Sequence, residues 1–308
     1  MLTKYTFLLL LFFAATYVCS AQTARPSLHL VNGNTYYLAS TGTSSIAQNI
    51  TGSESKVNLA TSFRMAFKVT GKEDTIYNLQ VSYQQLKMKI NTADTTIEID
   101  SKKHDQLDTA SSLIAEMMNK SFSITLSAGG RVTSVENADR IIAGVFDKFP
   151  RIDTAKKAQI KRWFMQSFGE NAFKAIIESG VAIFPRLVVT KGSKWSVNTR
   201  LSSPVDINVK INYRLVDISD AFYTVHGEGT MATDQDAQPK EINGLPIKYV
   251  IEGGTLTDIK IDRRTGWILE LSQKQLMAGN IEIKDNPKVP GGKTVPIFFT
   301  TDITTIGR

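Results

Sequence analysis

Three short stretches of the chain carry residue types that could perform chemistry. The first, at residues 107–112, reads Leu-Asp-Thr-Ala-Ser-Ser and is similar to the Asp-Thr-Gly/Ala-Ser loop of aspartic proteases. That chemistry needs two carboxylates that share one proton. The chain has no second copy of the loop, and no apolar strand leads into this one. Because Asp is a preferred residue directly before a helix, we expect Asp108 to be an N-cap.

The second stretch, His226-Gly227-Glu228, places two potential metal ligands on one face of a predicted strand. A zinc or iron site needs a third ligand, and the other histidines, His29 and His104, fall in unrelated loops. Asp234 and Asp236 could complete a loose calcium site, but the glycine and glutamate of a known calcium loop are missing. We therefore expect surface polar residues here and no metal.

The third stretch, Gly291-Gly292-Lys293-Thr294, resembles the end of a phosphate-binding loop. The first glycine of that motif would be residue 287, which is a proline, and a predicted strand follows instead of a helix. The chain also lacks the Gly-x-Ser-x-Gly elbow and the Gly-x-Gly-x-x-Gly fingerprint. The sequence thus predicts no catalytic residue and no cofactor, and a hydrolase ranks third among the functions considered.

One predicted helix, residues 154–168, combines aromatic and basic side chains. The basic residues are Lys156, Lys157, Lys161 and Arg162, and the aromatic ones are Trp163, Phe164 and Phe168. The aromatic residues are the candidate contacts for an apolar ligand, and the helix could also meet an anionic lipid surface. In the alternative interpretation the aromatic side chains pack on the sheet and the basic ones face water.

The N-terminal residues 1–21 have the organisation of a secretory signal peptide. Lys4 precedes an apolar run at residues 7–15, which is too short to span a bilayer, and Ala21 offers a cleavage site. We predict cleavage after Ala21 and a periplasmic or secreted protein. Lipid attachment at Cys19 and an uncleaved N-terminal anchor are the alternatives, although Val18 is not the small residue that precedes a lipidated cysteine. Cys19 is the only cysteine, so the predicted mature chain has no disulfide or thiolate chemistry.

Charge and composition narrow the possible partners. The chain has 36 Lys and Arg against 29 Asp and Glu, a net charge of +7, and the basic residues are spread along its length. Because no nucleic-acid motif is present in a chain predicted to be exported, we expect no nucleic-acid partner. The predicted mature chain contains no transmembrane span. Its oligomeric state is left open.

Hydrophobic periodicity predicts the elements that must position these residues. The chain is strand-rich at residues 28–100, helical at 107–180 and strand-rich again at 185–305. Apolar residues alternate from Val57 to Val69, and the parity switches between Tyr83 and Leu86, which predicts a β-bulge near Gln84. With no Pro- or Ser-rich linker, we predict a single α+β domain over residues 22–308. It would hold a large curved antiparallel sheet with a central block of three to four helices packed against it.

The order and spacing of these patterns carry a family resemblance. The residues concerned are 63–69, 83–90, 122–132, 213–215 and 262–266, and Phe184-Pro185 followed by Gly192 and Trp195. In these the chain resembles an uncharacterised family of secreted Bacteroidota proteins, domain of unknown function 6263. The resemblance implies an envelope location and no known activity, and it carries over no functional residue.

The sequence therefore favours a non-catalytic periplasmic or envelope protein. Its most favoured role is binding a hydrophobic ligand, such as a lipid or acyl chain, between the curved sheet and the helices. The alternative is a structural or protein-interaction component of the envelope that has no ligand.

Overall fold

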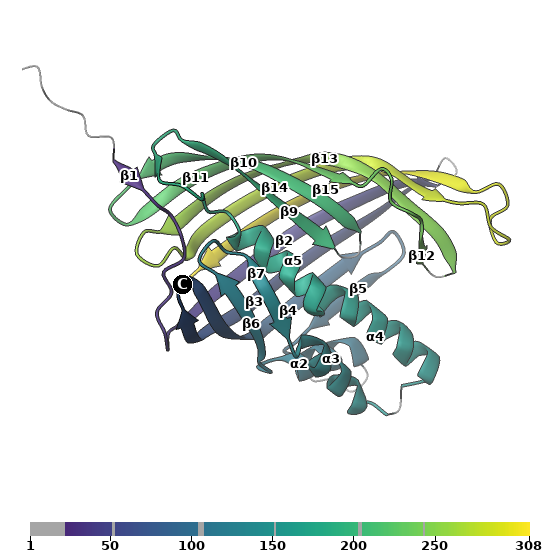
Figure 1. Cartoon of the computed structure of the whole chain (residues 1–308). Helices are drawn as coiled ribbons and strands as arrows, with labels where there is room; N and C mark the ends of the chain where they lie inside the picture. The colour runs from purple at the N-terminus through teal and green to yellow at the C-terminus, as the bar shows by residue number, and fades with distance from the viewer. Residues whose placement is uncertain (1–21, 51–52, 104–107, 151, 203–204, 243) are drawn as a thin grey trace, which may run out of the picture.

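The computed structural model describes residues 22–50, 53–103, 108–150, 152–202, 205–242 and 244–308 (Figure 1). The predicted signal peptide, residues 1–21 with Cys19, lies outside the described residues, and so do His104 and Leu107. Strands make up 58% and helices 17% of the structure, which confirms the β-rich α+β class.

Most strands of the main sheet are long, and successive strands pair as hairpins from β2 to β5, from β6 to β7, from β9 to β11 and from β12 to β15. In chain order they are β1 (Thr23–Ala24), β2 (Thr35–Ile50), β3 (Ser53–Glu73), β4 (Ile76–Asn91), β5 (Thr96–Asp100), β6 (Phe122–Ser127), β7 (Val132–Glu136), β8 (Val189–Thr190), β9 (Lys194–Ser202), β10 (Asp206–Ile218), β11 (Phe222–Thr233), β12 (Lys240–Ile242), β13 (Leu245–Asp262), β14 (Ile268–Ile283) and β15 (Lys293–Gly307).

Thirteen of these strands in the described residues form one curved antiparallel sheet. Its main order is β7-β6-β4-β3-β2-β15-β14-β13-β11-β10-β9, with β5 paired to β4 and β12 to β13. The last strand, β15, pairs with β2, so the two ends of the domain meet in the middle of the sheet. The strands β7 and β9 are left as the two edges, and β1 pairs separately with β8.

The β-bulge predicted near Gln84 is confirmed. Met65 pairs with Tyr83 while the preceding residue, Arg64, pairs with Gln85, so Gln84 has no cross-strand partner. The extra residue keeps Tyr83 and Leu86 on the same face, where both are buried. A bulge of this kind also increases the local twist, as the curvature of the sheet requires.

Two glycines allow the backbones of the paired strands β13 and β14 to approach each other closely. A Cβ atom on Gly253 would lie 2.0 Å from the Leu276 carbonyl oxygen, and one on Gly279 would lie 2.0 Å from that of Val250. Real Cβ contacts are never so short, so only glycine permits this approach of the two backbones.

The helices form the predicted central block. They are α2 (Thr109–Met117), α3 (Ala138–Asp147), α4 (Thr154–Phe168) and α5 (Glu170–Val181). The helix α5 packs against both edge strands, β7 and β9, and so bridges the open side of the sheet (Figure 1). The helix α4 packs chiefly on α3 and α5, while the sheet strands that lie closest to the helices are β5, β6, β7, β9 and β14.

The close approach of β13 and β14 at Gly253 gives a stability prediction. We expect Gly253→Ala to lower the free energy of unfolding by about 2 kcal/mol, because the new methyl group collides with the backbone of β14. The neighbouring Gly254→Ala is the control, since its Cβ would meet nothing closer than 3.4 Å. Urea denaturation of both variants measures the difference, and equal stabilities would show that the close approach of β13 and β14 does not need Gly253.

Candidate functional site

The two faces of the curved sheet differ sharply in charge. The cross-strand registers place every strand Asp and Glu with a described side chain on the convex face. The cations that fall on the concave face are Lys72, Lys240 and Lys293, each at the end of its strand. The concave face is therefore almost free of charge along most of its length.

Uncharged polar groups form a belt across the middle of this concave face. Ser44 and Thr301 hydroxyls lie 3.0 Å apart, and the Gln273 amide donates to the Thr257 hydroxyl at 3.3 Å. Thr255, only 3% exposed, is different, because its hydroxyl has no hydrogen-bond partner among the described residues. Leaving a buried hydroxyl unpaired costs about 1–3 kcal/mol, so the belt retains unused hydrogen-bonding capacity.

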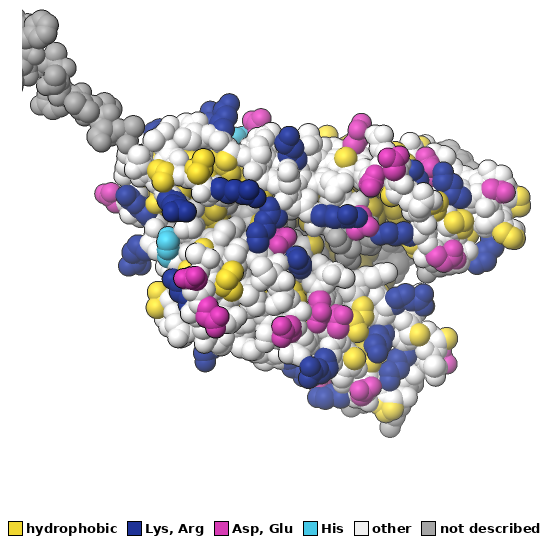
Figure 2. Space-filling view, in the orientation of Figure 1, with side chains coloured by type: hydrophobic (Ala, Val, Ile, Leu, Met, Phe, Trp, Pro, Cys, Tyr) yellow, Lys and Arg dark blue, Asp and Glu magenta, His cyan; other side chains and the backbone are white. Residues whose placement is uncertain are grey.

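Beyond the belt lies a run of apolar side chains that we call the apolar trough. Its members point to the concave face, and each is half-buried and thus still reachable by solvent. They are Ile46, Val57, Leu59, Phe63, Met88, Ile90, Met277, Phe299 and Ile303. In Figure 2 the surface is hollowed between the sheet and the helices at the lower right, with hydrophobic atoms visible inside the hollow.

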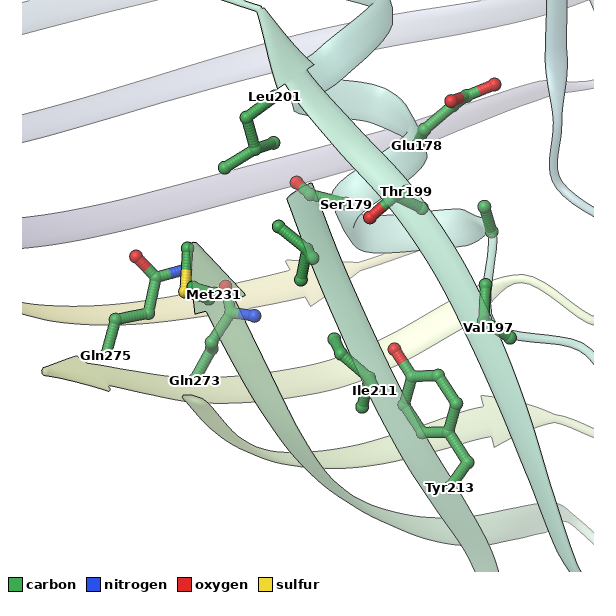
Figure 3. Close-up of a pocket in the computed structure, with 12 residues that line it drawn as sticks. Glu178, Ser179, Val197, Thr199, Leu201, Ile211, Tyr213, Met231, Gln273 and Gln275 are labelled. Carbon is green, nitrogen blue, oxygen red and sulfur yellow. The ribbon is translucent and has the colours of Figure 1, made fainter. Parts of the chain in front are cut away.

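By contrast, the space directly beneath α5 is nearly filled. A cavity of about 20 Å³ lies between α5 and the concave face of β9, β10, β11 and β14. Figure 3 shows Tyr213, Ile211, Met231, Gln273 and Glu178 around it. This volume admits about one water molecule. Burial raises the pKa of the Tyr213 phenol well above its ordinary value, so the ring faces the cavity uncharged.

A buried carboxylate on α5 connects the two edges of the sheet. Glu178 Oε1 accepts a hydrogen bond from the Val132 N–H at 2.9 Å, and its Oε2 lies 3.8 Å from Arg131 Nη1. Arg131 in turn donates from Nη2 to the Asn198 carbonyl on β9 at 2.6 Å. The Arg131–Glu178 pair thus ties β7, α5 and β9 together on the open side of the sheet.

The candidate ligand contacts Trp163, Phe164 and Phe168 lie in an aromatic cluster of the helical block. Phe164 is fully buried and its ring centroid is 5.3 Å from that of Phe146, while Phe168 packs 6.1 Å from Tyr83. Trp163 is half-buried beside them, with its ring 5.2 Å from that of Phe164. Each of the three rings thus packs against other aromatic rings. Their role as ligand contacts stays a prediction.

His226 and Glu228 lie on the convex face, where they pair with another side chain. His226 Nδ1 is 2.7 Å from Asp258 Oδ1, and Nε2 is 3.2 Å from Glu228 Oε1. The hydrogen bond to Asp258 is the largest cause that raises the pKa of His226, and the bond to Glu228 adds to it against the opposing effect of burial. Among the described residues, no group of three or more His, Cys, Asp or Glu could hold a metal ion.

Asp108 is the N-cap of α2, as predicted. Its carboxylate accepts from the Ser111 N–H at 3.0 Å and from the Ser111 hydroxyl at 2.6 Å. Burial works against the ionised form, but these hydrogen bonds outweigh it and hold the pKa of Asp108 below its ordinary value. The resemblance to a protease loop therefore reflects helix capping.

The part of the chain that the structure describes has no helix both long and apolar enough to cross a membrane. Sequence reasoning did not find the apolar trough. In each long strand the charged residues fall on alternate positions, and hence on one face. This pattern indicates a shared uncharged face only when the cross-strand registers are known.

Comparison with known proteins identifies a family but no function. The model of a family of unknown function, DUF6263, matches residues 74–268. No curated protein matches the chain.

Similar solved structures are distant. One is a structure of lipovitellin that describes its lipid–protein interactions. It shares 8% sequence identity with this chain at a TM-score of 0.43, and the match covers 89% of this chain and 25% of lipovitellin. The chain thus spans about a quarter of lipovitellin's length. An outer membrane channel from Pseudomonas putida F1 shares 7% sequence identity at a TM-score of 0.27, and the match covers 90% of this chain and 97% of the channel. The translocator domain of the autotransporter NalP from Neisseria meningitidis shares 6% sequence identity at a TM-score of 0.23, and the match covers 90% of this chain and 89% of that domain. Likeness at this level carries no functional argument.

The capping role of Asp108 predicts a specific stability loss. We expect Asp108→Ala to lower the free energy of unfolding by about 1 kcal/mol, because the first turn of α2 loses its side-chain acceptor. Asn caps helices as well as Asp, so Asp108→Asn is the control and stays close to the wild type. Denaturant titration decides, and an unaffected alanine variant would contradict the role.

The His226 cluster predicts a pH response. Because its folded pKa is raised, protonated His226 stabilises the fold below the ordinary value near 6.5, and this stabilisation is lost as the pH rises through the folded pKa. We expect an NMR titration of the His226 ring to show a pKa above 6.5 that falls in Asp258→Asn. The control Asp236→Asn, in an exposed loop, leaves it unchanged. A wild-type pKa at or below 6.5 would contradict the assignment.

Proposed function

The chain belongs to DUF6263, a family of unknown function, and we propose that it binds an apolar ligand on the concave face of its sheet. We further propose that it acts without catalysing a reaction, in the periplasm or outside the cell. The signal peptide predicted at residues 1–21 supports the location. The apolar trough supports the ligand class.

The observation that carries the proposal is the segregation of charge between the two faces. The helices of the described residues lie closest to β5, β6, β7, β9 and β14, and the trough residues on β2, β3 and β15 are only half-buried. Large exposed apolar patches on soluble proteins commonly mark binding surfaces. The trough is apolar, half-buried and bordered by uncharged groups, which suits a ligand without charge along its length.

The magnitude of burial makes such a complex feasible. A ligand that covers about 300 Å² of apolar surface gains roughly 7 kcal/mol at about 25 cal/mol per Å². Part of this gain is lost to the ordering of ligand and side chains. The remainder is compatible with reversible binding in the micromolar range.

The polar belt supports a ligand with an uncharged polar group near one end of its apolar part. The Thr255 hydroxyl has no hydrogen-bond partner in the described part of the chain, and the Gln275 side chain beside it lines the small cavity beneath α5. A hydroxyl or ester oxygen at this border could pair with these groups. The proposed ligand class is therefore a lipid or acyl chain.

The trough gives a direct binding test. We expect Leu59→Asp to weaken binding of the fluorescent apolar probe N-phenyl-1-naphthylamine more than tenfold, because the bound probe would bury an unpaired carboxylate. Ala60→Asp is the matched control, since Ala60 is the next residue of β3, is exposed and points to the convex face. Probe fluorescence is measured at equal protein concentration, and circular dichroism shows whether both variants fold.

Two results would contradict the proposal. One is a wild-type protein that does not bind the probe. The other is equal weakening by the two folded variants. Either result would favour the alternative role, an interaction or structural protein of the envelope without a ligand.

A further inference from the structure

A second large groove lies at the opposite end of the sheet from the apolar trough. It has a volume of about 1130 Å³ and runs beside the short β1–β8 pair, the start of β9 and the turn between β6 and β7 (β1 at the left of Figure 1). The loop at residues 184–189 forms one of its walls. This groove plays no part in the proposed apolar-ligand site.

The groove is strongly basic. Arg25, Lys72, Arg131, Arg186 and Lys194 line it, against the single carboxylate of Asp74. Among the described residues, only Arg131 of these five cations has a carboxylate within ion-pair distance, that of Glu178. Lys72 instead lies over the Tyr77 ring, 5.4 Å from its centroid. An excess of positive charge without internal partners points to an anionic counterpart.

Two exposed aliphatic side chains stand at the rim of the same groove. Leu187 is 78% exposed and Val188 is 59% exposed, and both directly follow Arg186. With this much of their surface exposed, the two adjacent aliphatic side chains bury little apolar area within the chain. A highly polar partner such as a nucleic acid would not use them either.

The loop that presents these residues is held in place from both sides. Phe184 and Val189, which flank it, are each only 7% exposed. The Trp195 indole N–H donates to the Ile183 carbonyl at 2.8 Å, and Thr23 and Ala24 of β1 pair with Thr190 and Val189. The exposed pair is thus part of an ordered surface, and its position beside the cations is fixed.

From this arrangement we infer that the groove docks on an anionic membrane surface. The cations Arg25, Lys72, Arg186 and Lys194 contact lipid phosphates, and Leu187 and Val188 enter the interface between headgroups and acyl chains. Peripheral membrane binding depends on this combination of buried apolar area and attraction to anionic lipids. Each Lys or Arg near such a surface contributes about 1 kcal/mol, or about fivefold in affinity.

The inference does not depend on the proposed apolar-ligand function. The groove and the cavity beneath α5 share Ala182 and Val197 in their walls, and the Arg131–Glu178 pair lies where the two meet. Docking would therefore bring the interior of the sheet close to the membrane. Docking can nevertheless be tested without any ligand in the trough.

The test is flotation of the purified protein with lipid vesicles. We expect the wild type to bind vesicles that contain phosphatidylcholine with 30% phosphatidylglycerol at about 0.1 M salt, and to be released by about 0.5 M salt as screening increases. The triple variant R25Q/R186Q/K194Q should bind at least tenfold more weakly. All three side chains are exposed, so the variant should melt at the wild-type temperature.

A control that removes cations elsewhere on the surface comes from α4. The variant K156Q/R162Q removes two exposed cations of this helix, and neither of them lines the groove. It should bind the vesicles within about twofold of the wild type. A second variant, L187S/V188S, keeps the charge and should lose most of the binding that persists at about 0.3 M salt.

Three outcomes would overturn the inference. The first is that the wild type and the triple variant bind the anionic vesicles equally. The second is that the wild type binds pure phosphatidylcholine vesicles as well as it binds the anionic ones. The third is that the α4 control loses as much binding as the triple variant. If the triple variant lost retention on heparin but still bound vesicles, the groove would serve a polyanionic partner instead, and membrane docking would also be refuted. Every variant carries the same N-terminus, so the differences report the groove alone.

Discussion

Strict alternation of side chains along very long strands is the constraint from which the other features of this protein follow. In a strand, successive side chains point to opposite faces, so a one-residue error in register would exchange the two faces completely. Here the carboxylates of the described strand residues all point outward, and the bulge at Gln84 restores the alternation where the sequence changes parity. Curvature then turns the uncharged face into the inside of the molecule.

The curved sheet has two free edge strands, β7 and β9. The helical block packs against these edges at one end of the sheet only. Helix α5 covers the gap between β7 and β9, and Glu178 with Arg131 joins the edges through polar contacts. Close packing beneath α5 leaves room for little more than a water molecule. The helices thus stabilise one end of the sheet, while the side chains of the apolar trough are only half-buried.

Much of this architecture follows from local patterns, and the rest depends on long-range pairing. Alternation from Val57 to Val69, the bulge and the cap at Asp108 are encoded within a few residues, and all three are present as predicted. The β15–β2 pairing, and the close approach of Gly253 to the backbone of β14, depend on partners far away in the chain. The basic groove is less visible still, because Arg25, Lys72 and Arg186 come from three distant segments and show only as dispersed charge.

Native mass spectrometry of the protein purified from its own cells tests whether the concave face holds an apolar molecule, as we propose. We expect a population heavier than the polypeptide, with an excess mass that organic extraction removes and that corresponds to a lipid or acyl chain. A single species at the polypeptide mass, unchanged after incubation with extracted lipid, would contradict it.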